Sequence, residues 1–341
     1  MFINSIVKKY LFPAISTVLA RPIYAMSNGL SKIPYRSVRS SILYDAITAS
    51  LPTPLMYTKF GAEHFVIDTR DKGGMPKQLF SEGTFDFGDF TLTLELLRQH
   101  NVYPGTPTLL IDVGANIGPI CIIAVARGYS KRAIAIEPEP HNCRLLRANI
   151  ALNGLTETIS VHESACGMFD NETLDLELSE DNLGDHRIRL SDLPGRDNED
   201  KRHKIQIRSN TLDTLCPVEP AENTLIWMDT QGYEGYVLAG ARRWLDSGMP
   251  LVMEFWPYGM KRVNSFALMK AALANYAGYH NLWQNPNRFC PISDLDDLYA
   301  ELDKAGDFGE IDADQRRPPG HASGRFTNIL AIGKTDAGFF R

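Results

Sequence analysis

A glycine-rich turn that begins with an acidic residue, Asp112-Val-Gly-Ala-Asn-Ile-Gly118, has the residue types of a ligand-binding loop. Glycine lets the backbone turn tightly and approach a ligand without a Cβ in the way. The apolar run 108–113 predicts a strand buried on both faces, and a helix is expected over 117–127. Because a helix start offers free N–H groups, such a turn predicts a site for a nucleotide cofactor.

The charges around this turn distinguish between two cofactors. NAD carries a pyrophosphate, which favours Gly-x-Gly-x-x-Gly without a neighbouring carboxylate, but here Asn116 takes the middle position and Asp112 precedes the loop. S-adenosylmethionine carries a sulfonium and an ammonium group, which carboxylates attract. Glu137, at the end of the next predicted strand, is placed to accept hydrogen bonds from both ribose hydroxyls. These features favour S-adenosylmethionine, and an NAD-dependent oxidoreductase is the alternative.

Strands and helices alternate from residue 108 onwards, which predicts right-handed crossovers and a parallel sheet. Strands are expected over 108–113, 133–136, 159–162, 224–228, 251–255, 281–284 and 328–332, with two more at 173–178 and 205–209 beside a charged insertion. Helices are expected over 91–99, 117–127, 141–152, 235–244, 266–276 and 292–302. We therefore expect a Rossmann-like α/β fold with a mostly parallel, doubly wound sheet and a ligand at the carboxyl ends of its strands.

The chain divides into an N-terminal extension over 1–79, helical and then with short strands, and a catalytic domain over 80–335. The apolar stretch 10–20 is interrupted by Pro13 and is too short to span a bilayer. We expect it to pack on the domain, with weak peripheral membrane contact as an alternative.

The bulk composition excludes several classes of partner and site. A formal net charge of -6 gives no reason to expect nucleic acid binding. Five widely spaced cysteines without a Cys-x-x-Cys pair argue against structural zinc and disulfides and indicate a reducing compartment. A cytoplasmic location is therefore expected.

Several segments within about residues 80–260 together resemble the FkbM-type methyltransferases. They are Leu110-Ile-Asp-Val-Gly-Ala-Asn-Ile-Gly118, Ile136-Glu-Pro138, Met228-Asp-Thr-Gln-Gly-Tyr-Glu234 and Val237-Leu-Ala-Gly-Ala241. The resemblance implies a class I methyltransferase fold, S-adenosylmethionine as cofactor and methyl transfer to oxygen, often on a sugar or secondary metabolite. The expected cofactor-binding residues are Asp112, Gly114, Ala115, Asn116, Gly118, Glu137, Pro138, Ala165 and Asp229. Trp227 stands where members commonly carry a lysine, so no function of that lysine is transferred.

Four residues are candidates for catalysis, because an alcohol acceptor needs a base to take its proton. Asp229, Glu234 and Glu254 follow or end predicted strands and could act as base, acceptor clamp or Mg²⁺ ligands; no metal site is expected, because no His/Asp spacing demands one. Asp229 is expected to face the methyl group across the pocket from the glycine loop. His186 in the charged insertion is a further candidate base. The expected acceptor is a glycan or small hydroxylated molecule; a methyltransferase-like domain that binds a partner without catalysis is the non-enzymatic alternative.

Overall fold

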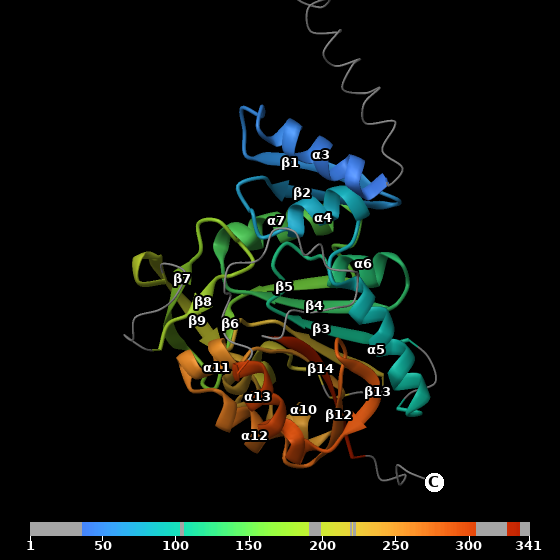
Figure 1. The fold of residues 1–341 in the computed structure, drawn as a ribbon, viewed down its shortest axis with the longest axis vertical. Coiled ribbons are helices and arrows are strands. Elements are labelled where there is room, and N and C mark those ends of the chain that lie inside the picture. The colour runs from blue at the N-terminus through green and yellow to red at the C-terminus, as the bar shows by residue number, and fades with distance from the viewer. Residues whose placement is uncertain are drawn as a thin grey trace, which may run out of the picture.

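The structure is a computed structural model and describes residues 36–102, 106–190, 199–218, 220, 223–304 and 326–334. It begins with α3 (Arg36–Thr48), the hairpin β1 (Leu55–Phe60) and β2 (Glu63–Asp68), α4 (Met75–Glu82) and α5 (Phe87–Gln99) (Figure 1). The stretch 10–20, for which packing or membrane contact was expected, lies outside the described residues. Within the described ranges, no helix combines the length and apolarity needed to cross a membrane.

An eight-stranded sheet forms the centre of the molecule, in the order β13-β12-β14-β11-β10-β3-β4-β5. Its strands are β3 (Leu109–Val113), β4 (Arg132–Glu137), β5 (Ile159–Glu163), β10 (Thr224–Met228), β11 (Leu251–Phe255), β12 (Tyr276–Asn281), β13 (Asn285–Cys290) and β14 (Thr327–Gly333). The strands from β11 to β5 run parallel, and β14 pairs antiparallel with β11 and β12. The chain winds from β3 towards β5 and then returns to β10 on the other side, which confirms the predicted doubly wound α/β fold.

Helices cover both faces of this sheet because its central strands are apolar on both sides. Along β3, Leu110 packs in a core with α5, α6 and α7, whereas Leu109 and Ile111 pack in the opposite core with α9 to α13. The bounds are α6 (Cys121–Ala126), α7 (Pro140–Leu152), α8 (Leu212–Leu215), α9 (Glu234–Ala239), α10 (Arg242–Asp246), α11 (Pro257–Val263), α12 (Phe266–Leu273), η3 (Ile292–Asp294) and α13 (Leu295–Lys304).

Residues 165–210, which include the charged insertion, form a second, four-stranded sheet in the order β6-β9-β7-β8. Its elements are β6 (Ala165–Cys166), β7 (Glu172–Leu178), β8 (Arg187–Ile188), η2 (Glu199–Lys201) and β9 (His203–Asn210). Leu176, Ile188 and Ile207 join the same core as α9 to α13. The insertion is therefore an integral layer beside the main sheet (Figure 1).

The predicted bounds or types of two elements in the C-terminal half were wrong. The helix expected over 266–276 ends at Leu273, and the strand expected over 281–284 is replaced by β12, a short turn and β13. A run rich in alanine favours helix locally, but 276–281 pairs with β14 and β13 in the sheet. A Cβ on Gly278 would lie 2.4 Å from the Cys290 carbonyl oxygen, so glycine permits this close strand contact.

The N-terminal hairpin is bound to the catalytic domain through two asparagines of α7. Asn149 Oδ1 accepts the Val66 N–H at 2.6 Å, and Asn153 Oδ1 accepts the His64 N–H at 2.9 Å. Asn153 also donates to the His64 carbonyl at 2.7 Å. These amides satisfy backbone groups on the free edge of β2, so the hairpin packs as part of the same body.

Candidate functional site

A cavity of about 1020 Å³ opens at the carboxyl ends of β3, β4, β10 and β11. This is the point where the strand order reverses, which is the usual ligand site of an open α/β sheet. The predicted residues that line it are Asp112, Gly114, Ala115, Asn116, Glu137, Pro138, Ala165, His186, Asp229 and Glu254. Gly118 and Glu234 do not line the cavity.

The glycine loop and the turn after β10 fit directly against each other. The Asp229 N–H donates to the Val113 carbonyl at 2.9 Å, and a Cβ on Gly114 would lie 1.9 Å from the Asp229 carbonyl oxygen. Gly114 also has a left-handed φ of 83°. The expectation that Asp229 lies across the pocket from this loop was therefore wrong, because β10 pairs directly with β3.

Gly118 has a structural task beside the loop. A Cβ there would lie 2.6 Å from Ile122 Cδ1 and 2.8 Å from Leu146 Cδ1, so glycine allows α6 and α7 to pack closely. The helix expected to start at residue 117 begins at Cys121, since the preceding residues complete the turn.

Asp112 and Glu137 place buried carboxyl groups on the wall of the cavity. Asp112 Oδ2 accepts the Cys121 N–H at 3.1 Å at the start of α6. Glu137 accepts the Asn116 N–H through Oε2 at 2.8 Å and the Glu139 N–H through Oε1 at 2.9 Å. Burial raises the pKa of both carboxyl groups to about 7. The two backbone N–H groups and the Asn142 side chain hold Glu137 in place, and its two oxygens have about four lone-pair sites, so it can still accept from a ligand.

The loop also presents a polar atom without a partner. Asn116 has a left-handed φ of 52°, and among the described residues nothing donates to its buried Oδ1. Together with Asp112, Glu137 and Asp229, this orphaned acceptor gives the wall a surplus of hydrogen-bond acceptors, and a bound cation would favour the charged form of the three carboxyl groups. A ligand with hydroxyl donors and a cationic centre, such as S-adenosylmethionine, fits these acceptors, whereas the anionic pyrophosphate of NAD does not.

Three acidic side chains meet at the ends of β10 and β11. Asp229, Glu234 and Glu254 each offer an oxygen within 4.8 Å of the others, and within the described chain these are the groups that could together hold a metal ion. Gln231 Nε2 links Asp229 at 2.7 Å and Glu254 at 3.2 Å. Burial raises the pKa of all three carboxyl groups, that of Glu234 to about 7.

Glu234 differs from the other two acids in its contacts. Its Oε1 accepts from the Thr230 N–H and hydroxyl, both at 2.9 Å, and it lies at the start of α9. These bonds close the turn 230–234, in which Gln231 has a left-handed φ of 55°. Glu234 therefore shapes the turn that presents Asp229 and Gln231 to the cavity.

His186 lines the cavity as a hydrogen-bonded, neutral ring. Its Nδ1 accepts the Ser179 N–H at 3.0 Å, which leaves the ring hydrogen on Nε2. Burial lowers the pKa of His186 to about 4. In this tautomer both ring nitrogens are engaged, Nδ1 as the acceptor of the Ser179 N–H and Nε2 as a protonated donor, so proton abstraction by His186 would require the bond to Ser179 to break.

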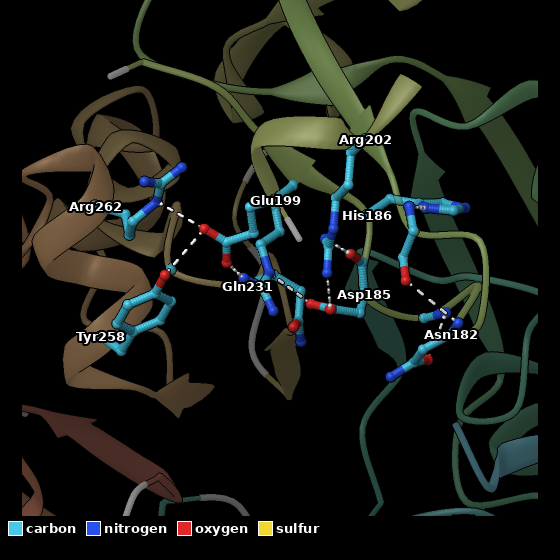
Figure 2. Close-up of polar contacts among 12 residues, drawn as sticks. Asn182, Asp185, His186, Glu199, Arg202, Gln231, Tyr258 and Arg262 are labelled. Carbon is cyan, nitrogen blue, oxygen red and sulfur yellow. Dashed lines mark hydrogen bonds and ion pairs between the residues drawn. The ribbon is translucent and has the colours of Figure 1, made fainter. Parts of the chain in front are cut away.

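A network of ion pairs joins the insertion to α11, and the sequence analysis did not identify it (Figure 2). Glu199 is fully buried and bonds Arg187, Arg262 Nε at 3.1 Å and the Tyr258 hydroxyl at 2.9 Å. Asp185 pairs with Arg187 at 2.5 Å and Arg202 at 2.7 Å. Acidic residues and arginines alternate within 185–202, but a solvent-exposed surface has the same pattern, so the sequence does not identify a buried ion-pair network.

Residues from distant segments complete the cavity. Gly73 and Met75 come from the extension, Phe85 and Asp86 precede α5, and Trp283 follows β12. Two residues of the N-terminal extension therefore reach the cavity. No motif or spacing marks these positions, because they reach the cavity only through packing of the chain.

We expect Asp112→Asn and Glu137→Gln each to weaken S-adenosylmethionine binding roughly ten- to a hundredfold, since a charge-assisted hydrogen bond contributes about 1.5–3 kcal/mol. Isothermal calorimetry on folded variants measures the change. Glu163→Gln is the matched control, because Glu163 pairs in register with Glu137 on β5 but does not line the cavity. Unchanged affinity in both cavity variants would place the cofactor elsewhere.

Comparisons with known proteins add a family to this geometry. A family model described as the methyltransferase FkbM domain matches residues 112–286, just over half of the chain. No curated protein matches the sequence.

Several solved structures are similar at low identity. An RNA methyltransferase from Salinibacter ruber in complex with S-adenosyl-L-homocysteine is 13% identical, with 48% of this chain and 74% of that chain covered and a TM-score of 0.26. A geranyl diphosphate C-methyltransferase from Streptomyces coelicolor A3(2) is 11% identical, with 89% and 100% covered and a TM-score of 0.37. Because both TM-scores are low, the fold is assigned from the strand order.

Proposed function

The chain belongs to the methyltransferase FkbM family, and from this premise we propose that it uses S-adenosylmethionine to methylate a hydroxyl group of a carbohydrate or small hydroxylated metabolite. The observation that carries the proposal is the acidic wall of the cavity. Asp112, Glu137 and Asp229 end or follow three neighbouring strands and line one cavity beside the glycine loop. Carboxyl groups so placed suit a nucleoside with a cationic centre.

Each residue of this wall would contribute a different part of cofactor binding. Glu137, held by two backbone N–H groups, would accept hydrogen bonds from the ribose hydroxyls. Asp229 lies against Gly114, so its charge would face the cationic end of the cofactor. When bound, S-adenosylmethionine supplies an electrophilic methyl group on its sulfonium. The protein must then hold an acceptor oxygen about 3 Å from that methyl, in line with the sulfur.

The insertion would exclude water from this reaction. Segment 179–188 lines the cavity, and the Leu183 carbonyl accepts from Asn142 Nδ2 of α7 at 3.0 Å. On the other side, the Arg187 guanidinium lies 4.5 Å from the centre of the Trp256 ring. These contacts fasten the segment over the glycine loop, and exclusion of water strengthens the electrostatic interactions beneath it.

The aromatic side chains in the cavity support a ring-shaped acceptor. Trp256 and Trp283 line it together with Glu254 and Asp229. Indole faces stack on apolar surfaces such as the C–H face of a sugar, and carboxylates accept from its hydroxyls. We also propose a cytoplasmic location, because the five cysteines are free thiols, which suit a reducing compartment.

Calorimetric titration with S-adenosylmethionine and with NAD tests the cofactor. Turnover is then measured as S-adenosylhomocysteine formed in the presence of monosaccharides and methyl glycosides. We expect binding of S-adenosylmethionine only, and product with at least one hydroxylated acceptor. Binding of NAD instead would contradict the cofactor, and cofactor binding without product would indicate a methyltransferase-like domain that does not catalyse.

A further inference from the structure

Asp86 occupies the N-cap of α5 but does not cap the helix. Aspartate is favoured at this position because its carboxylate normally accepts an N–H from the first turn. Here the side chain makes no such bond, and the backbone is left-handed, with φ 51° and ψ 12°. Left-handed backbone is uncommon for residues other than glycine and is found where the surroundings impose it, often at functional sites. At Asp86 the helix therefore lacks a side-chain cap, and the backbone is strained.

The next acidic residue of the same helix shows the contrast. Asp89 Oδ2 accepts from Trp283 Nε1 at 2.5 Å and from Asn328 Nδ2 at 2.8 Å. Asp89 thus fixes the Trp283 indole on the cavity wall. The Asp86 carboxylate, in contrast, accepts no hydrogen bond from any residue that the structure describes, and Asp86 is exposed and is one of the residues that line the cavity.

The surroundings of Asp86 suit a group that exchanges a proton. Phe85, which precedes Asp86 in the chain, and the aromatic residues Trp283 and Phe326 line the same cavity. Asp86 is exposed, yet desolvation by the surrounding protein, followed by the charges of Asp89 and Asp229, raises its pKa to about 7. Asp229 follows β10 and also lines the cavity, so both carboxyl groups border the space available to an acceptor.

We propose that Asp86, and not Asp229, is the base that takes the proton of the acceptor hydroxyl. The inference rests on the proposed methyl transfer. The acceptor oxygen bonds to the methyl carbon while the carbon–sulfur bond breaks and leaves its electron pair on sulfur; the hydroxyl proton passes to an Asp86 carboxylate oxygen. Asp86 is suited to this role because it is unbonded and reachable, whereas the Asp229 carboxylate already accepts from Gln231 at 2.7 Å.

Asp86→Asn tests this role, because asparagine also tolerates a left-handed backbone and keeps the shape of the side chain. At saturating S-adenosylmethionine, with the methyl glycoside that the wild type converts best, the maximal rate should fall by about 10²–10⁴. Cofactor affinity should not change. The wild-type rate should rise with pH up to about 7, as Asp86 loses its proton, and this dependence should be absent from the variant.

Three further variants make the result specific. Glu95→Gln removes an exposed acid from the same helix and should leave rate and affinity unchanged. Asp229→Asn should mainly weaken cofactor binding and keep the pH dependence. Asp86→Gly relieves the backbone strain, so it should be at least as stable as the wild type and still slow.

The outcomes separate this proposal from the one on which it rests. If the wild type turns over and Asp86→Asn has the same rate, the role of Asp86 is overturned but the proposed function stands. The same holds for a loss of cofactor affinity in Asp86→Asn, or a pH dependence that disappears in Asp229→Asn instead. A wild-type protein that forms no S-adenosylhomocysteine with any acceptor would overturn the proposed function itself, and the role of Asp86 with it.

Discussion

Replacing Gly114 by alanine is expected to weaken S-adenosylmethionine binding by about a hundredfold or more, which is the largest effect of any single methyl group added to this site. The new Cβ would lie 1.9 Å from the Asp229 carbonyl oxygen, far inside van der Waals contact. The left-handed φ of 83° adds backbone strain. Overpacking and strain each cost about 1–3 kcal/mol, and together they displace the loop from the turn after β10.

Gly128→Ala is the matched control for this experiment. Gly128 also has a left-handed φ, 73°, but a Cβ there would meet nothing within 4 Å. It therefore carries the same kind of backbone strain without the collision. Calorimetric binding and thermal unfolding of both variants separate the two effects; equal losses of affinity would show that the contact between loop and turn is unimportant.

Removing the charge of Glu199 is expected to lower the free energy of unfolding by about 3–5 kcal/mol, because a broken buried ion pair leaves an uncompensated charge. In Glu199→Gln, Arg262 and Arg187 lose their shared carboxylate in a fully buried place. Arg187 keeps only Asp185 as an acidic partner among the residues that the structure describes. Denaturant titration measures the loss.

Asp296→Asn provides the exposed counterpart. Asp296 pairs with Lys270 at 2.5 Å, and its side chain is 59% exposed. Exposed pairs typically contribute about 0–1 kcal/mol, so this variant should unfold almost as the wild type does. A Glu199→Gln variant as stable as Asp296→Asn would mean that the network does not hold the insertion to α11.

The hydrogen bonds of the catalytic candidates suit them to different tasks. Glu234 closes its own turn through Thr230, whereas Asp229 presents its carboxylate to the cavity beside Gly114. His186 is held as a neutral donor by Ser179. Residues of similar chemistry thus differ in which of their atoms remain available. Asp112 and Glu137 also line the cavity with a pKa of about 7, but their carboxyl groups accept backbone hydrogen bonds, whereas that of Asp86 accepts none from the described residues.

The main sheet and the acidic residues on the cavity wall could be predicted from sequence because both depend on local pattern. A strand buried on two faces appears as a continuous apolar run, as in β3, and its end marks where a ligand can bind. Asp112 ends such a run and Glu137 ends the next, so their place on the wall follows from parallel pairing of neighbouring strands. The same reasoning placed Asp229 and Glu254 at the carboxyl ends of their strands.

Contacts between distant segments could be decided only by the tertiary structure. Trp283 and Asp89 are 194 positions apart, and Glu199 and Tyr258 are 59 apart, so no periodicity links them. Residues 276–281 have the alanine- and glycine-containing sequence of a helix end, yet they form β12 because β14 and β13 supply hydrogen-bond partners on both sides. The helix expected over 91–99 begins at Phe87 in the structure, so the sequence pattern did not single out Asp86 at its start. The exposure of Asp86 to the cavity arises from packing of α5 against a sheet formed much later in the chain, which local pattern does not record.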